Sequence, residues 1–267
     1  VFSVSPIGYL YIPIQTFLLL FIAKSPKITM KENATEVFMK ITYLGHASLL
    51  VQSKNYSVII DPYLSKNPLI DIDPKSINVD AVIVSHGHHD HIGDSITIAK
   101  NNHCPIVASR QLCNHFLLSD HSVSTISAQI GVRTQLAWGE IELTPAIHGD
   151  KVDIINNLKD TAPPTGILLT MNGKTLYHLG DTYLFDEMKT IGDTHTIAIA
   201  ALPIGGIYTT DIDESIIVAK KIKAKQYIPI HYDTFEDIQA NPAEWQEKMQ
   251  SNGFNTTLIN YKETISI

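Results

Sequence analysis

Histidines and an aspartate crowd into one short segment of the chain, Ser85-His86-Gly87-His88-His89-Asp90-His91. The segment follows the apolar run 81–84, which is typical of a strand buried on both faces, so it lies in the loop that leaves the strand. Side chains two positions apart in extended backbone point the same way, so His86 and His88 can hold one ion together. If the chain then turns at Gly93-Asp94, Asp90 and His91 face a second ion nearby.

Imidazole and carboxylate groups favour Zn(II), Mn(II) or Fe(II), and the lack of thiolates in the segment disfavours a closed structural zinc site. A surface histidine cluster that binds metal adventitiously is the competing interpretation. Three further candidate ligands, His148, Asp181 and His231, each come at the end of another apolar run. Since sites in α/β sheets collect beyond the carboxyl ends of strands, we expect all of these residues to form one site.

The elements that position these residues begin at Met39, where a β meander gives way to alternating strands and helices, twice over. The pattern predicts helices over 94–101, with Asp94 as a candidate cap, and over 111–118, 185–191, 213–223 and 242–250. It predicts strands over 40–44, 48–52, 57–60, 81–84, 140–147, 167–171, 175–179, 196–202 and 227–230, with two short strands at the end. This order favours two sheets packed face to face with helices outside.

Two connections stand out in the second half of the chain. Asn172-Gly173 is typical of a two-residue hairpin turn. Residues 149–164 form the longest irregular stretch, and long loops in compact domains often carry function.

Composition narrows the class of protein. The 267 residues are 44% apolar and 18% charged, which is ordinary for a globular chain of one large domain or two small ones. The net charge of −7 disfavours a nucleic-acid partner, because phosphate binding usually needs a basic face. Cys104 and Cys113 form no paired motif and read as reduced thiols in a reducing compartment.

The first 38 residues differ from the rest of the chain. No charged side chain occurs in residues 1–23, and three lysines follow at positions 24, 27 and 31. The segment reads as a translated extension or artefact, or as a membrane anchor whose lysines would keep the main body cytoplasmic. A secretory signal is disfavoured, because the basic start and small-residue cleavage site are missing. We therefore expect a cytoplasmic protein that touches a membrane only through residues 1–23.

The order of the candidate ligands resembles that of the metallo-β-lactamase superfamily, in which a His-x-His-x-Asp-His segment precedes a lone His, a lone Asp and a lone His. The likeness extends to a family of uncharacterised metal-dependent hydrolases, related to ascorbate-phosphate lactonases and N-acylphosphatidylethanolamine phospholipases. It rests on Ile41-Thr42-Tyr43-Leu44-Gly45-His46-Ala47-Ser48, Ile60-Asp61-Pro62, Gly166-Ile167-Leu168-Leu169-Thr170, Tyr177-His178-Leu179-Gly180-Asp181-Thr182 and Pro229-Ile230-His231-Tyr232-Asp233-Thr234-Phe235. It covers about Met39 to the carboxyl terminus, so residues 39–267 are the expected hydrolase domain.

The resemblance implies a four-layer αββα sandwich that holds two divalent cations, most simply Zn(II). It implies that His86, His88 and His148 hold one ion, that Asp90, His91 and His231 hold the other, and that Asp181 bridges both. Asp90 and His231 are also the candidate catalytic residues. A hydroxide shared by the two ions would attack an ester, lactone or phosphodiester in a small molecule.

Other residues near the motifs have smaller expected roles. We expect Asp61 and His46 to orient ligands without binding metal, His89 to point away, and His178 to be a satisfied core residue. One departure from the relatives runs from Tyr208 to Asp213, where they tend to have a Thr-Met-Gly-Pro-like turn and this chain has Thr209-Thr210-Asp211-Ile212, and it bears on substrate preference. Two alternatives to the small-molecule hydrolase remain: a nuclease of the same superfamily and a non-catalytic metal-binding sensor.

Overall fold

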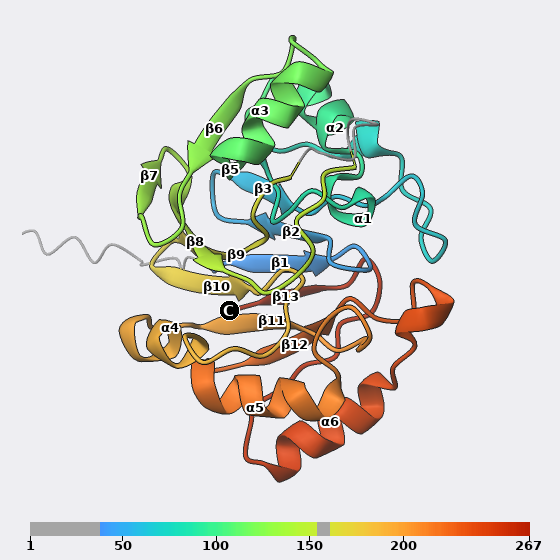
Figure 1. Cartoon of the computed structure of the whole chain (residues 1–267), viewed down its shortest axis with the longest axis vertical. Helices are drawn as coiled ribbons and strands as arrows, with labels where there is room; N and C mark the ends of the chain where they lie inside the picture. The colour runs from blue at the N-terminus through green and yellow to red at the C-terminus, as the bar shows by residue number, and fades with distance from the viewer. Residues whose placement is uncertain (1–37, 154–160) are drawn as a thin grey trace, which may run out of the picture. The chain divides into compact units, whose positions relative to one another are not determined.

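The computed structural model describes residues 38–153 and 161–267 (Figure 1). In this part of the chain the strands form two sheets. The seven-stranded sheet has the order β13 (Thr264–Ser266), β1 (Lys40–Tyr43), β2 (Leu49–Gln52), β3 (Ser57–Ile60), β4 (Ala81–Ile83), β5 (Ile106–Ser109) and β6 (Thr125–Ala128). The six-stranded sheet has the order β12 (Tyr227–Ile230), β11 (Ile199–Pro203), β10 (Lys174–His178), β9 (Thr165–Met171), β8 (Gly139–Pro145) and β7 (Thr134–Leu136).

Helices cover the outer face of each sheet (Figure 1). The seven-stranded sheet packs against α2 (Ser95–Asn102) and α3 (Arg110–Ser119), close to the short α1 (His89–Ile92) and the 3₁₀ turn η1 (Pro74–Ser76). The six-stranded sheet packs against α4 (Met188–Thr194), α5 (Ile212–Ile222) and α6 (Pro242–Ser251), with the 3₁₀ turn η2 (Glu236–Ile238) before α6. The predicted four-layer αββα sandwich is confirmed.

Alternating side chains explain why the sheets stack in this way. In β3, Val58 and Ile60 face the core between the two sheets, whereas Ile59 faces the helices on the outer side. In β11, Ile199 and Ala201 face inward, and Ala200 and Leu202 face α5 and its neighbours. Because successive side chains of a strand point to opposite faces, a strand that is apolar throughout needs cover on both sides.

Most predicted elements are confirmed, within a residue or two at their ends. Asn172-Gly173 forms the predicted turn, with both φ angles positive, at 51° and 73°, between β9 and β10. Asp94 precedes α2 as expected, but its carboxylate accepts hydrogen bonds from the backbone N–H groups of Leu64 and Ser65 and makes no cap bond to the helix. The aspartate therefore ties the β3–β4 connection to the start of α2.

Three predictions of elements are wrong. The helix predicted over 185–191 begins at Met188, because Phe185 is buried in the helix-covered core and leads the chain into it. The described chain closes with one strand, β13, and Thr256 makes only an isolated bridge to Tyr227. Strands β5, β6 and β7 were not predicted, because each has only three or four residues and lies next to polar turns.

The structure tests the membrane and redox predictions only in part. Within residues 38–153 and 161–267, no helix combines the length and apolar character that crossing a bilayer requires. The predicted anchor in residues 1–23 and residues 154–160 of the irregular stretch 149–164 lie outside the described residues. Cys104 and Cys113 are free and buried, and burial raises the pKa of the Cys104 thiol to about 11, so both thiols are held in their neutral form.

Candidate metal centre

The candidate ligands lie just beyond the ends of several strands, where they come together in space. The loop after β4 carries His86 and His88 and leads into α1, which carries Asp90 and His91, and the loops after β8, β10 and β12 carry His148, Asp181 and His231. Parallel pairing of β10, β11 and β12 brings two of these loops to one edge of the six-stranded sheet. The sheet topology therefore gathers residues that lie up to 145 positions apart in the sequence.

One group of ligand atoms consists of imidazoles, and we call His86, His88 and His148 the imidazole cluster. The Nδ1 atom of His88 lies 3.0 Å from the Nε2 atom of His86 and 3.0 Å from the Nε2 atom of His148. Together with a carboxylate oxygen of Asp181, these atoms lie within 4.8 Å of one another. Ring nitrogens that converge at this spacing suit a tetrahedral divalent cation.

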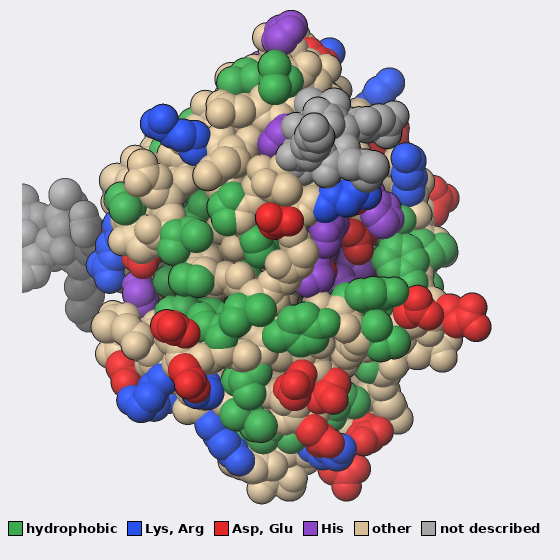
Figure 2. Space-filling model, viewed as in Figure 1, with side chains coloured by type: hydrophobic (Ala, Val, Ile, Leu, Met, Phe, Trp, Pro, Cys, Tyr) green, Lys and Arg blue, Asp and Glu red, His purple; other side chains and the backbone are tan. Residues whose placement is uncertain are grey.

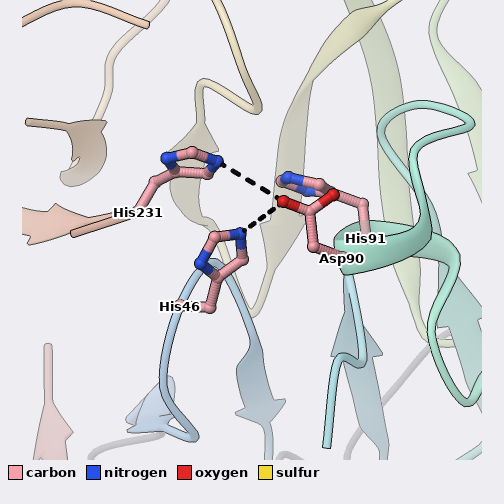
Figure 3. A group of neighbouring side chains, drawn as sticks. All are labelled: His46, Asp90, His91 and His231. Atoms are coloured by element: carbon pink, nitrogen blue, oxygen red, sulfur yellow. Dashed lines mark hydrogen bonds and ion pairs between the residues drawn. The ribbon is translucent and has the colours of Figure 1, made fainter. Parts of the chain in front are cut away.

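The second group combines imidazoles with a carboxylate, and we call His46, Asp90, His91 and His231 the mixed cluster (Figure 3). Their ligand atoms also lie within 4.8 Å of one another. The Oδ2 atom of Asp90 lies 3.1 Å from the Nε2 atom of His46 and 3.9 Å from the Nε2 atom of His231. His46 was predicted to orient a ligand without binding metal, but its ring nitrogen lies among the candidate ligand atoms themselves.

Asp181 touches both clusters. Its Oδ2 atom lies 3.5 Å from His148 Nε2 and 3.8 Å from His86 Nε2 in the imidazole cluster. The same carboxylate lies 2.9 Å from His231 Nε2 and 3.2 Å from His91 Nε2 in the mixed cluster. A buried carboxylate between two sets of nitrogen and oxygen donors has the position that a bridging ligand requires.

A carboxylate and a hydroxyl hold two of the ligands in the correct tautomer. The Nδ1–H of His91 donates to Asp61 Oδ2 over 2.8 Å, which leaves the Nε2 atom facing the site. The Ser85 hydroxyl donates to the same Asp61 oxygen over 2.6 Å, so it accepts from the Nδ1–H of His86 at 3.0 Å. Asp61 and Ser85 therefore connect a ligand of each cluster, as partners behind metal-binding histidines commonly do.

The mixed cluster includes strained backbone. His46 has a φ of 54°, His231 has a φ of 55°, and the N–H of His231 donates to the carbonyl of His46 over 2.8 Å. Non-glycine residues in the left-handed region cost free energy and persist at functional sites, where the surrounding structure holds them. A carboxylate can only accept, so His46 donates from Nε2 to Asp90 Oδ2 over 3.1 Å and accepts at Nδ1 from the Thr234 hydroxyl over 2.9 Å.

His178 has a structural role, as predicted. It is fully buried, donates from Nε2 to the Ala47 carbonyl over 2.8 Å, and accepts at Nδ1 from the N–H of Gly180. These two bonds tie the turn that carries His46 to the turn that carries Asp181. His89 is exposed and belongs to neither cluster, as predicted, but it does not point away from the site, because it lines the same cavity as Asp90 and His148.

The two clusters differ in protonation. Burial lowers the pKa of His86, His88 and His148, so all three rings are neutral at pH 7. Burial also lowers the pKa of His91, but the carboxylates of Asp181 and Asp61 outweigh it and hold that pKa well above the usual value.

The pKa values of His46, Asp90 and Asp181 are lowered. Burial lowers the pKa of His46 to about 4, which keeps the ring neutral. Burial raises the pKa of Asp90 and of Asp181, yet the histidines that face them lower both pKa values below the usual carboxyl range. Both carboxylates are therefore ionised at neutral pH.

Buried ligand atoms without partners test whether cations fit this centre. Among the described residues, His91 Nε2, Asp181 Oδ1 and both ring nitrogens of His231 are buried and make no hydrogen bond. Unsatisfied buried polar atoms are rare in folded proteins and call for an explanation. Cations would satisfy His91 Nε2, Asp181 Oδ1 and the Nε2 atom of His231, and the nitrogen and oxygen donors suit zinc, so the residues fit the metals that the sequence predicts.

The centre opens into a cavity of about 490 Å³, a size ordinary for a small-molecule site. Tyr208, Phe235 and Asp237 line it with the ligands, and no role was assigned from the sequence to Phe235 or Asp237. The Phe235 ring lies 5.6 Å from the ring of His46, and the Tyr208 hydroxyl donates to Asp237 over 3.0 Å. Tyr208 begins the departure noted at 208–213, so the sequence had indicated this part of the wall.

Comparison with known proteins agrees with this centre. Residues 56–232 match the β-lactamase superfamily domain. The chain is 39% identical over 215 residues to a UPF0173 metal-dependent hydrolase of Bacillus cereus, covering 80% of this chain and 94% of that protein. The structure of Igni18, a metallo hydrolase from the hyperthermophilic archaeon Ignicoccus hospitalis, has a TM-score of 0.77 at 32% identity, covering 86% of this chain and 98% of that one.

A more distant structure shows the same fold. It is an isothiocyanate hydrolase from Delia radicum gut bacteria, with a TM-score of 0.69 at 18% identity, covering 86% of this chain and 99% of that one. Fold, ligand order and relatives agree, and the chain belongs to the metallo-β-lactamase superfamily, within its UPF0173 family of metal-dependent hydrolases.

Proposed function

We propose that the protein hydrolyses an ester, lactone or phosphodiester bond in a small molecule, with two divalent cations held by the imidazole and mixed clusters. One observation carries this proposal: the Asp181 carboxylate lies within 4 Å of ligand nitrogens of both clusters. A purely structural metal site is closed by its ligands, whereas this centre opens into a cavity. Bound cations would supply a hydroxide at neutral pH and polarise the substrate oxygen.

The side chains of the chain would share this work. His86, His88 and His148 would hold one cation, and Asp90, His91 and His231 the other, with His46 beside them and Asp181 between. Asp61 and Ser85 would keep the Nε2 lone pairs of His91 and His86 directed at the cations. Zinc suits the donor set best, because the described ligand atoms are imidazole nitrogens and carboxylate oxygens without thiolates.

Metal content and turnover of the full chain test the proposal. The protein would be stripped with a chelator, refilled with Zn(II), Mn(II) or Fe(II), and assayed on p-nitrophenyl esters, lactones and bis(p-nitrophenyl) phosphate. We expect two ions per chain and turnover that disappears and returns with the metal. Two ions without turnover on any substrate would favour the metal-binding sensor, and fewer than two would contradict the dinuclear centre.

A nucleic-acid substrate is a separate outcome of the same preparation. The net charge of −7 and the acidic cavity lining disfavour it. Retardation of single-stranded DNA or RNA at low salt, with cleavage lost in excess chelator, would replace the small-molecule substrate with a nuclease activity.

A further inference from the structure

Large hydrophobic side chains are exposed beside the cavity, and we call Ile147, Tyr183, Ile207 and Tyr208 the apolar rim. Between 39% and 64% of each side chain is exposed. The space-filling view shows hydrophobic side chains next to the histidines of the centre (Figure 2). Contiguous exposed apolar surface is uncommon on soluble proteins and marks sites that bind something apolar.

The rim is one connected feature, built from three loops. The N–H of Tyr183 donates to the carbonyl of Ile147 over 3.0 Å, and the Tyr183 hydroxyl donates to the carbonyl of Ile207. The same loops carry the centre, because His148 follows Ile147 and Asp181 comes two positions before Tyr183. Tyr208 belongs both to the rim and to the wall of the cavity. A molecule whose reacting bond reaches Asp181 therefore extends along the rim.

Charge in the cavity points in the same direction. Its described lining holds three carboxylates, Asp90, Asp181 and Asp237, with histidines, but neither lysine nor arginine. Asp90 and Asp181 face the two clusters, whereas Asp237 lies beside Tyr208, away from the ligand atoms. Lys151, in the loop after His148, pairs with Asp153 over 2.6 Å. A second anionic group on a substrate would face Asp237 with no described cation in the lining to balance it.

We propose that the substrate is a small molecule whose group away from the hydrolysed bond is apolar and uncharged. The ring of Tyr208 contacts that group, and the carboxylate of Asp237 excludes a phosphate or carboxylate there. This inference rests on the proposed function, since it concerns the same cavity, and it narrows the substrate class from esters in general to those with an alkyl or aryl group.

The test compares two esters that differ only at the far end, with the metal-loaded full chain. p-Nitrophenyl hexanoate ends in a methyl group, and mono-p-nitrophenyl adipate ends in a carboxylate at nearly the same length. After correction for the rates of spontaneous hydrolysis, we expect kcat/KM to favour the hexanoate by about tenfold or more. Equal values, or a preference for the adipate, would overturn the inference while leaving the hydrolase intact.

Variants separate the ring from the carboxylate. Tyr208→Ala should lower kcat/KM for the hexanoate by about tenfold, and Tyr208→Phe, which keeps the ring, should restore it. Asp237→Asn should raise the ratio of kcat/KM for the adipate to that for the hexanoate several-fold. Tyr56→Ala is the matched control: Tyr56 is also an exposed tyrosine, but it precedes β3, at the opposite end of that strand from Asp61. An equal effect of Tyr56→Ala and Tyr208→Ala would contradict the role of the rim.

A binding measurement keeps the inference testable if no ester is turned over. Hexanohydroxamic acid and adipic monohydroxamic acid both carry a metal-binding hydroxamate and differ only at the far end. Calorimetry on the metal-loaded chain should show about tenfold tighter binding of the hexanoyl compound. That preference without turnover would reject the proposed function and retain the rim, whereas equal or no binding would overturn the inference.

Discussion

The imidazole cluster and the mixed cluster lie side by side but differ in charge and enclosure. His88 and His148 of the imidazole cluster are only partly buried and line the cavity. In the mixed cluster His46, His91 and His231 are fully or almost fully buried, and Asp90 adds a carboxylate. An enclosed anionic site binds a divalent cation more tightly than an open neutral one, so we expect the mixed cluster to retain its cation longer.

The support behind the clusters differs as well. The Asp61 carboxylate lies behind His91, and it is fully buried with the imidazole it orients. Behind His86 lies the neutral hydroxyl of Ser85. Charged support strengthens the basicity of a ligand more than a hydroxyl does, so the second layer of contacts reinforces the contrast between the clusters.

Removal of the shared carboxylate should have the largest effect, because it affects both clusters at once. Asp181→Asn replaces one oxygen with an amide N–H₂, which cannot bind a cation. We expect metal content to fall below two ions per chain and kcat to fall by about a thousandfold. Metal analysis and turnover of p-nitrophenyl hexanoate would check this, with Asp186→Asn as the control at an exposed aspartate paired with Lys221. Two retained ions would show that the clusters hold their cations independently.

The next largest expected effect is a difference between the two clusters in the pH dependence of metal binding. His91 has a raised pKa, so at neutral pH it carries a proton that a cation in the mixed cluster must displace. The pKa values of His86, His88 and His148 are lowered, so above about pH 6.5 the imidazole cluster binds without releasing a proton. Affinity of the mixed cluster should therefore rise about tenfold per pH unit from pH 6 to 8, and that of the imidazole cluster should stay nearly constant.

Calorimetry in buffers of different ionisation enthalpy would count the released protons. His148→Ala weakens only the imidazole cluster, so the ion that this variant still binds reports on the mixed cluster. Proton release near one per ion in that variant is the expected result. Release near zero would mean that His91 is neutral before the metal arrives, and the contrast in protonation would fail.

Replacement of the Asp61 carboxylate behind His91 should have a smaller effect. Asp61 has a φ of 46°, a conformation that asparagine tolerates, so Asp61→Asn changes the chemistry and spares the backbone. The amide group would face the Nδ1–H of His91 and favour the other tautomer, which blocks Nε2. We expect metal affinity of the mixed cluster to fall about 10- to 100-fold. Nitrogen chemical shifts of His91 would report the tautomer, and Asp80→Asn, at a carboxylate that accepts from Ser57 N–H, is the control.

The layout of the fold could be predicted from the sequence because the apolar runs are long and the turns carry clear signals. The runs at 57–60 and 227–230 match β3 and β12 at both ends. Helix α4 begins at Met188, three residues after the predicted start. The apolar Phe185 at the predicted start packs in the core and is not part of a helical repeat. Local pattern cannot distinguish these two causes.

The candidate site could be predicted as a set of residues but not as a geometry. Strand ends identified all seven ligands, and the structure brings them together, while their binding of metal remains a prediction. The position of His46 among the ligand atoms depends on a positive φ and on a hydroxyl 188 positions away, and neither leaves a local signal. Phe235 and Asp237 also escaped prediction, because single side chains on a cavity wall follow no periodicity.

Removal of the Thr234 hydroxyl should have the smallest effect, and it tests whether His46 belongs with the mixed cluster. Thr234→Val keeps the shape of this buried side chain and removes the hydroxyl that donates to His46 Nδ1. Without that partner the His46 ring can turn away from Asp90, so its Nε2 atom is no longer held beside the ligand atoms of the mixed cluster. We expect the metal-free protein to lose about 1 kcal/mol in the free energy of unfolding, and the mixed cluster to bind its ion several-fold more weakly.

Denaturant titration and calorimetry would measure the two effects separately. Thr144→Val is the matched control, because Thr144 is also buried and its hydroxyl bonds to Tyr177 away from the centre. That variant should lose stability by a similar amount and bind metal as before. If both variants bind metal equally well, His46 only packs beside Asp90, and the mixed cluster reduces to Asp90, His91 and His231 with the shared Asp181.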